Sequence, residues 1–172
     1  MHFNQLQTLV ACLICLLTIV SGQDSDLTVK TNQFTVKGVL ETNTTNVRVF
    51  RRVPYAEPPI GIHRFRSPVT KKPESKILDA TKFGPSCIQL NNGQPTAYTQ
   101  YVPGFLLAPG ATTDEDCLSL IIWAPRAKVN QSLPVIIYIP GGGFTSGGAN
   151  SPYKYGGPIV RDNQDVIVIS MK

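Results

Sequence analysis

The sequence predicts an α/β fold in which antiparallel strands at the amino end lead into a mostly parallel central sheet. Short strands separated by turn residues fill positions 27–50, a pattern typical of antiparallel pairs. The runs Val135–Ile139 and Val166–Ser170 are instead continuously apolar and largely β-branched, which is typical of parallel strands buried on both faces. The connection between them, 140–165, is long enough for the crossover that parallel neighbours require.

The amino end of the chain predicts a cleaved secretory signal over residues 1–22. An uncharged apolar run from Leu9 to Val20 is followed by Val20-Ser21-Gly22, which suits cleavage by a signal peptidase after Gly22. The run is short for a membrane span, and a signal anchor is the alternative interpretation. The remaining residues, 23–172, are enough for one modest hydrophobic core and not for two.

Turn and loop chemistry divides the rest of the chain. Residues 37–38 and 43–46 supply breaks between the amino-terminal strands, as glycine and asparagine commonly do. Prolines between 54 and 73 are too frequent for regular structure, which predicts an extended surface segment. Residues 88–113 form a second irregular stretch, and a loop of this length in a compact domain is usually functional. A further apolar strand is predicted over 118–123, and no long helix is expected.

The cysteines and the charged residues indicate which cellular compartment and which classes of partner the protein has. Beyond the leader only Cys87 and Cys117 remain, so a disulfide is predicted, with two buried thiols as the alternative. Sequons at Asn43 and Asn130 suit surface turns of a glycosylated protein. The 16 basic and 11 acidic residues are scattered, so they indicate a solvated face and no nucleic-acid partner. No cluster has metal-ligand spacing, and no metal or cofactor is expected.

The strand at 135–139 runs directly into a glycine loop, Gly141-Gly142-Gly143, followed by Phe144. Glycine backbone can turn its amide groups toward one point, so such a loop is suited to stabilise negative charge on a substrate oxygen. The loop lacks the Lys-Ser/Thr ending of a nucleotide-binding P-loop, which argues against phosphate binding. The sequence therefore predicts an oxyanion-binding loop.

The groups that such a loop would serve are not recognisable in this sequence. No serine has glycine two residues before and two residues after it, and the nearest match, Thr145 between Gly143 and Gly147, is a poor nucleophile elbow. His2 lies in the leader, and His63 lies in the proline-rich segment, where an exposed loop side chain is a better interpretation than a general base. No catalytic residue is therefore assigned in this chain.

Three motifs occur in order along the chain: Phe50–Gly61 followed by Arg64-Phe65 and Pro68, then Glu115–Pro125, then Gly141–Phe144. Together they resemble the amino-terminal third of the type-B carboxylesterase/lipase family, which includes the cholinesterases and fungal lipases. The resemblance covers residues 27–171. It implies the amino-terminal part of an α/β-hydrolase fold, and hydrolysis of a small-molecule or lipid ester by a serine that a histidine and an acidic residue activate.

The resemblance also assigns roles to individual residues. It implies that the backbone N–H groups of Gly142 and Gly143 hold the oxyanion, together with the amide that follows the serine. Cys87 and Cys117 match the family's first disulfide, whose loop lines or covers the active-site entrance. Arg64 and Glu115 match a family ion pair that fastens this loop to the body.

In the family the serine elbow follows the position of Lys172. The expectation is thus an amino-terminal fragment of a secreted carboxylic-ester hydrolase, inactive by itself. Two alternatives stay open: a non-catalytic relative that binds partners through the same fold, as adhesion proteins do, and a truncated pseudogene product. The sequence does not indicate the ester or the oligomeric state.

Overall fold

The computed structural model describes residues 25–172 except 90–96, 103–106, 108–109, 128–130 and 144. The predicted signal segment 1–22, the sequon residue Asn130 and the loop residue Phe144 therefore lie outside the described residues. The elements in chain order are η2 Ser25–Leu27, β1 Thr28–Lys30, β2 Thr35–Lys37, β3 Val39–Leu40, β4 Val47–Pro54, η3 Gly61–His63, β5 Ile77–Asp79, α2 Ala97–Tyr101, β6 Ser119–Pro125, β7 Val135–Tyr138, η5 Pro152–Lys154, α3 Gly157–Asp162 and β8 Ile167–Met171.

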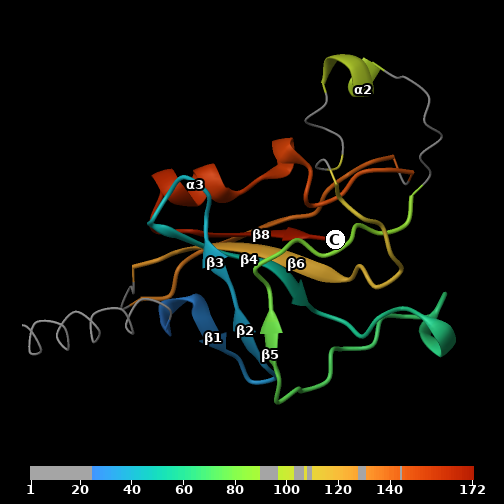
Figure 1. Cartoon of the computed structure of the whole chain (residues 1–172), viewed down its shortest axis with the longest axis horizontal. Coiled ribbons are helices and arrows are strands. Elements are labelled where there is room, and N and C mark those ends of the chain that lie inside the picture. The colour runs from blue at the N-terminus through green and yellow to red at the C-terminus, as the bar shows by residue number, and fades with distance from the viewer. Residues whose placement is uncertain (1–24, 90–96, 103–106, 108–109, 128–130, 144) are drawn as a thin grey trace, which may run out of the picture.

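The strands form two sheets, which Figure 1 shows lying on top of one another. The small sheet has the order β1-β2-β5, and the large sheet has the order β3-β4-β6-β8-β7. In the large sheet the neighbouring pairs β3–β4, β4–β6 and β6–β8 are antiparallel, while the pair β7–β8 is parallel. The predicted α/β class is confirmed, with antiparallel amino-terminal strands leading to a parallel pair. Strand β5, which pairs parallel to β2, was not predicted.

Strand β4 contributes to both faces of the large sheet. Val47 and Val49 face one side and Phe50 the other, as the alternation of a strand requires. The pairing with β6 shifts register between Phe50 and Val53, and this irregularity turns Val53 to the same side as Phe50. A single strand therefore supplies two hydrophobic clusters.

The two clusters lie on opposite faces of the large sheet. One packs under α3 and comprises Val47, Val49, Ile121, Trp123, Ala149, Val160 and Val168. The other packs between the sheets and comprises Phe34, Val36, Phe50, Val53 and Ala80. Figure 1 shows α3 on one side and β1, β2 and β5 on the other. The chain passes from the small to the large sheet at Gly38, where a Cβ would stand 2.6 Å from the Val49 carbonyl oxygen.

Strand β7 corrects one expectation. Its apolar residues do not alternate with polar ones, which predicted that both faces are buried. The four residues from Val135 to Tyr138 are instead each 41–58% exposed, and Ile139 is 72% exposed. In the described residues β7 is one of the two edge strands of the large sheet and pairs with β8 alone. Strand β8 is half-buried, with Val168 and Ser170 inside. The β-branched pattern correctly gave parallel pairing, while burial depends on what packs over the faces.

The proline-rich segment behaves as predicted. Between β4 and β5 the described chain has no strand, apart from an isolated bridge between Ala56 and Thr70, and only the short η3 turn. None of the helices in the part of the chain that the structure describes is long and apolar enough to cross a membrane.

Candidate functional site

The glycine loop leaves β7 as an exposed, tight turn. The carbonyl oxygen of Gly142 accepts hydrogen bonds from the amides of Thr145 and Ser146, both at 3.1 Å, and from the Thr145 hydroxyl at 3.3 Å. Gly143 has a φ of 59°, in the left-handed region that favours glycine. The turn therefore depends on glycine at position 143 for its conformation.

Position 142 depends on glycine for a different reason. A Cβ built on Gly142 would stand 1.5 Å from the carbonyl oxygen of Ser146, so any side chain would collide with the backbone across the turn. The amides of Gly142 and Gly143 donate no hydrogen bond to the described residues, and both glycines are exposed. As far as the described residues are concerned, both N–H groups are therefore available to a ligand.

A lysine holds the first peptide unit of the loop. The Nζ atom of Lys154, the last residue of η5, donates to the carbonyl oxygen of Gly141 at 3.2 Å. Partial burial lowers the pKa of Lys154 below its usual value. The carbonyls of Gly141 and Gly142 are thus both bound, while the amides that follow them have no acceptor in the part of the chain that the structure describes.

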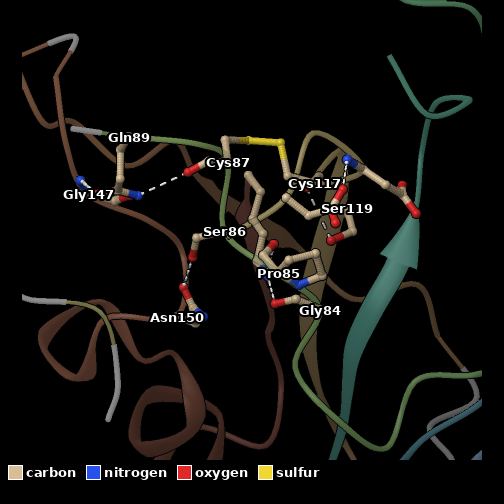
Figure 2. The surroundings of a disulfide bond; sticks show 12 residues. Gly84, Pro85, Ser86, Cys87, Gln89, Cys117, Ser119, Gly147 and Asn150 are labelled. Carbon is tan, nitrogen blue, oxygen red and sulfur yellow. Dashed lines mark hydrogen bonds between the residues drawn. A yellow bond between two sulfur atoms is a disulfide. The ribbon is translucent and has the colours of Figure 1, made fainter. Parts of the chain in front are cut away.

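The far end of the loop is clamped by a glutamine. The Gln89 side-chain amide donates to the Gly147 carbonyl at 2.9 Å and accepts from the Gly147 amide at 2.8 Å. Its Nε2 also donates to the Cys87 carbonyl at 3.2 Å. Gly147 has a φ of 109°, in the left-handed region. Figure 2 shows this clamp beside the disulfide.

The same segment makes a second, buried contact with the chain that follows the loop. The Ser86 hydroxyl donates to Asn150 Oδ1 at 2.8 Å, and both side chains are buried. Gly148 packs closely against this pair, because a Cβ there would stand 3.1 Å from both Ser86 Oγ and Asn150 Oδ1. Residues 86–89 therefore support the glycine loop along residues 147–150 (Figure 2).

The structure joins Cys87 to Cys117 in a disulfide across a sequence separation of 30. Cys117 is buried two residues before β6 begins. The bridge thereby ties the segment that carries Ser86 and Gln89 to the central sheet. The disulfide is the structural link between the sheet and the clamp on the glycine loop.

Removing the disulfide, by substituting both Cys87 and Cys117 with alanine, is expected to lower the free energy of unfolding by about 3 kcal/mol. The bridge restricts the unfolded chain, and its loss frees about 30 residues. Urea midpoints measured with and without dithiothreitol test this. The reductant should destabilise the unsubstituted protein and leave the double variant unchanged. A double variant as stable as the oxidised protein would contradict the prediction.

Arg64 and Glu115 form an ion pair with Nε and Oε1 2.5 Å apart. The Arg64 side chain is 54% exposed, so the pair lies at the surface and contributes about 0–1 kcal/mol. The Arg64 guanidinium also lies 4.7 Å from the centre of the Phe65 ring. These contacts place η3 beside the segment before Cys117 without anchoring it strongly.

The remaining residues singled out in the sequence lie apart from the loop. Asn43 is exposed in the turn between β3 and β4, with a φ of 61°. His63 ends η3 and is partly buried. Sequence reasoning did not single out Lys154 or Gln89, because their contacts with the loop join residues 13 and 58 positions apart. Neither contact leaves a local pattern.

Comparison with known proteins places these features in a family. Residues 25–172 match the model of the carboxylesterase family. The chain is 45% identical over 149 residues to a chlorogenic acid esterase of Aspergillus niger, covering 84% of this chain and 28% of that protein. It is 35% identical over 193 residues to secreted lipase 5 of Gibberella zeae, covering 100% of this chain and 35% of that protein.

An acetylcholinesterase of Bungarus fasciatus is 34% identical over 164 residues, covering 95% of this chain and 26% of that protein. The chain thus spans about a quarter to a third of the length of these curated relatives. The family match includes the glycine loop, the disulfide and the parallel strand pair. This chain therefore belongs to the carboxylesterase family.

Proposed function

We propose that this chain is the amino-terminal part of a secreted carboxylic-ester hydrolase and supplies two of its oxyanion-binding amides. The observation that carries the proposal is the glycine loop, in which the carbonyls of Gly141 and Gly142 are bound and the amides of Gly142 and Gly143 donate to no acceptor among the described residues. Free, preorganised N–H groups are the donors that stabilise a tetrahedral oxyanion in acyl transfer. The serine, the histidine and the acidic residue belong to the remaining length of the protein.

The relatives support an ester as the substrate. Their names describe an esterase of chlorogenic acid, a lipase and an acetylcholinesterase, three proteins that act on different carboxylic esters. The proposal therefore specifies the class of bond that is hydrolysed, which is a carboxylic ester of a small molecule or a lipid. It requires no cofactor, because hydrogen-bond donors and a serine nucleophile suffice for the reaction.

The exposed edge of the large sheet supports the proposal of a longer protein. Strand β7 exposes Val135, Ile136 and Ile137 at 48–58% each, although β-branched strands of parallel sheets are normally covered on both faces. A chain that spans about a quarter to a third of its relatives leaves ample length to supply that cover. This longer protein is called the full-length protein.

Secretion is part of the same proposal. The apolar leader at 1–22 precedes the matched region, a disulfide is present, and one relative is named a secreted lipase. Disulfides persist in oxidising compartments. The exposed turn at Asn43 leaves its sequon accessible for glycosylation, and Asn130 is a second acceptor in the proposal.

An activity assay on two proteins tests the proposal. The full-length protein is expected to hydrolyse p-nitrophenyl acetate, while the purified 172-residue chain is expected not to. Hydrolysis by the 172-residue chain, abolished by a substitution within it, would overturn the division of the machinery proposed here. A full-length protein that binds partners but hydrolyses no ester would identify a non-catalytic relative instead.

A further inference from the structure

The two proposed donors belong to two consecutive peptide units, and each unit is rigid. A trans peptide group is planar, and its carbonyl oxygen and amide hydrogen point in opposite directions. Binding the carbonyl of Gly141 therefore fixes the direction of the Gly142 amide. In the same way, binding the carbonyl of Gly142 fixes the direction of the Gly143 amide.

The two carbonyls are held by different means. The Gly142 carbonyl is bound within the turn, by the amides of Thr145 and Ser146. The Gly141 carbonyl is bound from outside the turn, by Lys154 Nζ at 3.2 Å. Glycine adopts conformations on both sides of φ = 0 with little steric cost, so a peptide unit between two glycines can rotate when nothing holds it. The first unit thus depends on Lys154.

Lys154 is itself attached firmly to the core. Its amide donates to the Ser151 carbonyl at 2.9 Å, and the Ser151 side chain is fully buried. The next residue, Tyr155, packs edge-on against Trp123 with ring centres 4.9 Å apart and donates its hydroxyl proton to Glu41 at 2.6 Å. The side chain of Lys154 therefore extends toward the loop from a backbone fixed on both sides.

We propose that Lys154 is a positioning residue that, by donating to the Gly141 carbonyl, holds the Gly142 amide in the direction of the substrate oxyanion. The inference rests on the proposed function and adds to it a residue outside the glycine loop. Lys154 does not touch the reacting atoms. It acts through the peptide unit between Gly141 and Gly142, and the positive charge polarises that unit so that its N–H becomes a better donor.

The test compares three substitutions in the full-length protein: Lys154→Met, which removes the donor at similar length, Lys154→Arg, which keeps a donor, and Lys76→Met, a matched change at an exposed lysine. Lys154→Met is expected to lower kcat for p-nitrophenyl acetate by about 10- to 100-fold, less than the loss of a whole oxyanion donor. KM should change little, because the affected interaction strengthens in the transition state. Lys154→Arg should recover most of the activity, and Lys76→Met should not lose any.

A second readout separates positioning from stability. A trifluoromethyl ketone forms a tetrahedral oxyanion adduct on a serine esterase, and Lys154→Met should weaken its binding in proportion to the loss of kcat. A loss of activity that follows the urea midpoint, with adduct affinity unchanged, would overturn the inference, as would unchanged kcat in Lys154→Met. A full-length protein without any ester hydrolysis would overturn the proposed function and this role together.

Discussion

Replacing Gly142 by alanine in the full-length protein is expected to lower kcat for ester hydrolysis by about 100- to 1,000-fold, the effect of losing one oxyanion donor. A Cβ at this position would stand 1.5 Å from the Ser146 carbonyl oxygen and 2.7 Å from the Ser146 carbonyl carbon. Both atoms belong to the backbone, so no side-chain rotation relieves the collision. The turn must open, and the amides of Gly142 and Gly143 then lose their present directions.

Steady-state kinetics on p-nitrophenyl acetate measure this effect, with the loss expected in kcat and little change in KM. Gly141→Ala is the matched comparison. A Cβ on Gly141 meets no heavy atom of the described residues within 4 Å, and the φ of Gly141 lies outside the left-handed region. We expect a much smaller loss of kcat in this variant. Equal losses in the two variants would show that the effect does not arise from the geometry of position 142.

The strands of the large sheet could be predicted because their signals are local. The β-branched runs at 135–139 and 166–170 predicted two strands that pair in parallel, as observed. The short strands separated by turn residues near the amino end predicted the antiparallel pairs. The register shift after Phe50 left no such signal, since it depends on the pairing with β6. The prediction that β7 is buried was wrong for a related reason. A run of apolar residues shows that both faces of a strand can be buried, but tertiary packing decides whether other elements cover them.

The candidate site divides in the same way. The glycine loop could be found from the sequence, because only glycine permits the close approach at position 142 and the positive φ at position 143. Gln89 and Lys154 could not, because a single amide or ammonium group reaching a distant carbonyl has no periodicity or spacing. Their roles follow from tertiary geometry, in which residues 86–89 and 152–154 converge on the loop.

A buried carboxylate connects the site to the rest of the fold. Glu41 is 7% exposed and lies just after β3. It accepts hydrogen bonds from Trp123 Nε1 at 3.0 Å, from the Tyr155 hydroxyl at 2.6 Å and from the Thr42 amide at 2.6 Å. The Arg51 guanidinium lies 3.8 Å from Oε1, the oxygen that accepts from the Thr42 amide, while Trp123 and Tyr155 both donate to Oε2. Burial, together with this carboxylate, raises the pKa of Tyr155 to about 12, which keeps its hydroxyl a donor.

The second large effect is expected at this carboxylate. Glu41→Ala should lower the free energy of unfolding by about 3 to 5 kcal/mol, as removal of one partner from a buried charged network does. The Trp123 indole N–H loses its acceptor in the core, and a buried unsatisfied donor costs about 1–3 kcal/mol. The Arg51 side chain, only 19% exposed, loses its counter-charge. Urea unfolding of the full-length protein should show a lower midpoint at an unchanged slope.

Glu74→Ala is the control for Glu41→Ala, because Glu74 is a glutamate whose ion pair, with Lys71, lies nearer the surface. Its side chain is 34% exposed, so its loss should cost under about 1 kcal/mol. Because Tyr155 adjoins Lys154, Glu41→Ala should also lower kcat in molecules that remain folded, whereas Glu74→Ala should not. If both variants shifted the midpoint equally, the Glu41 carboxylate would not be the group that fixes the segment after the glycine loop to the core.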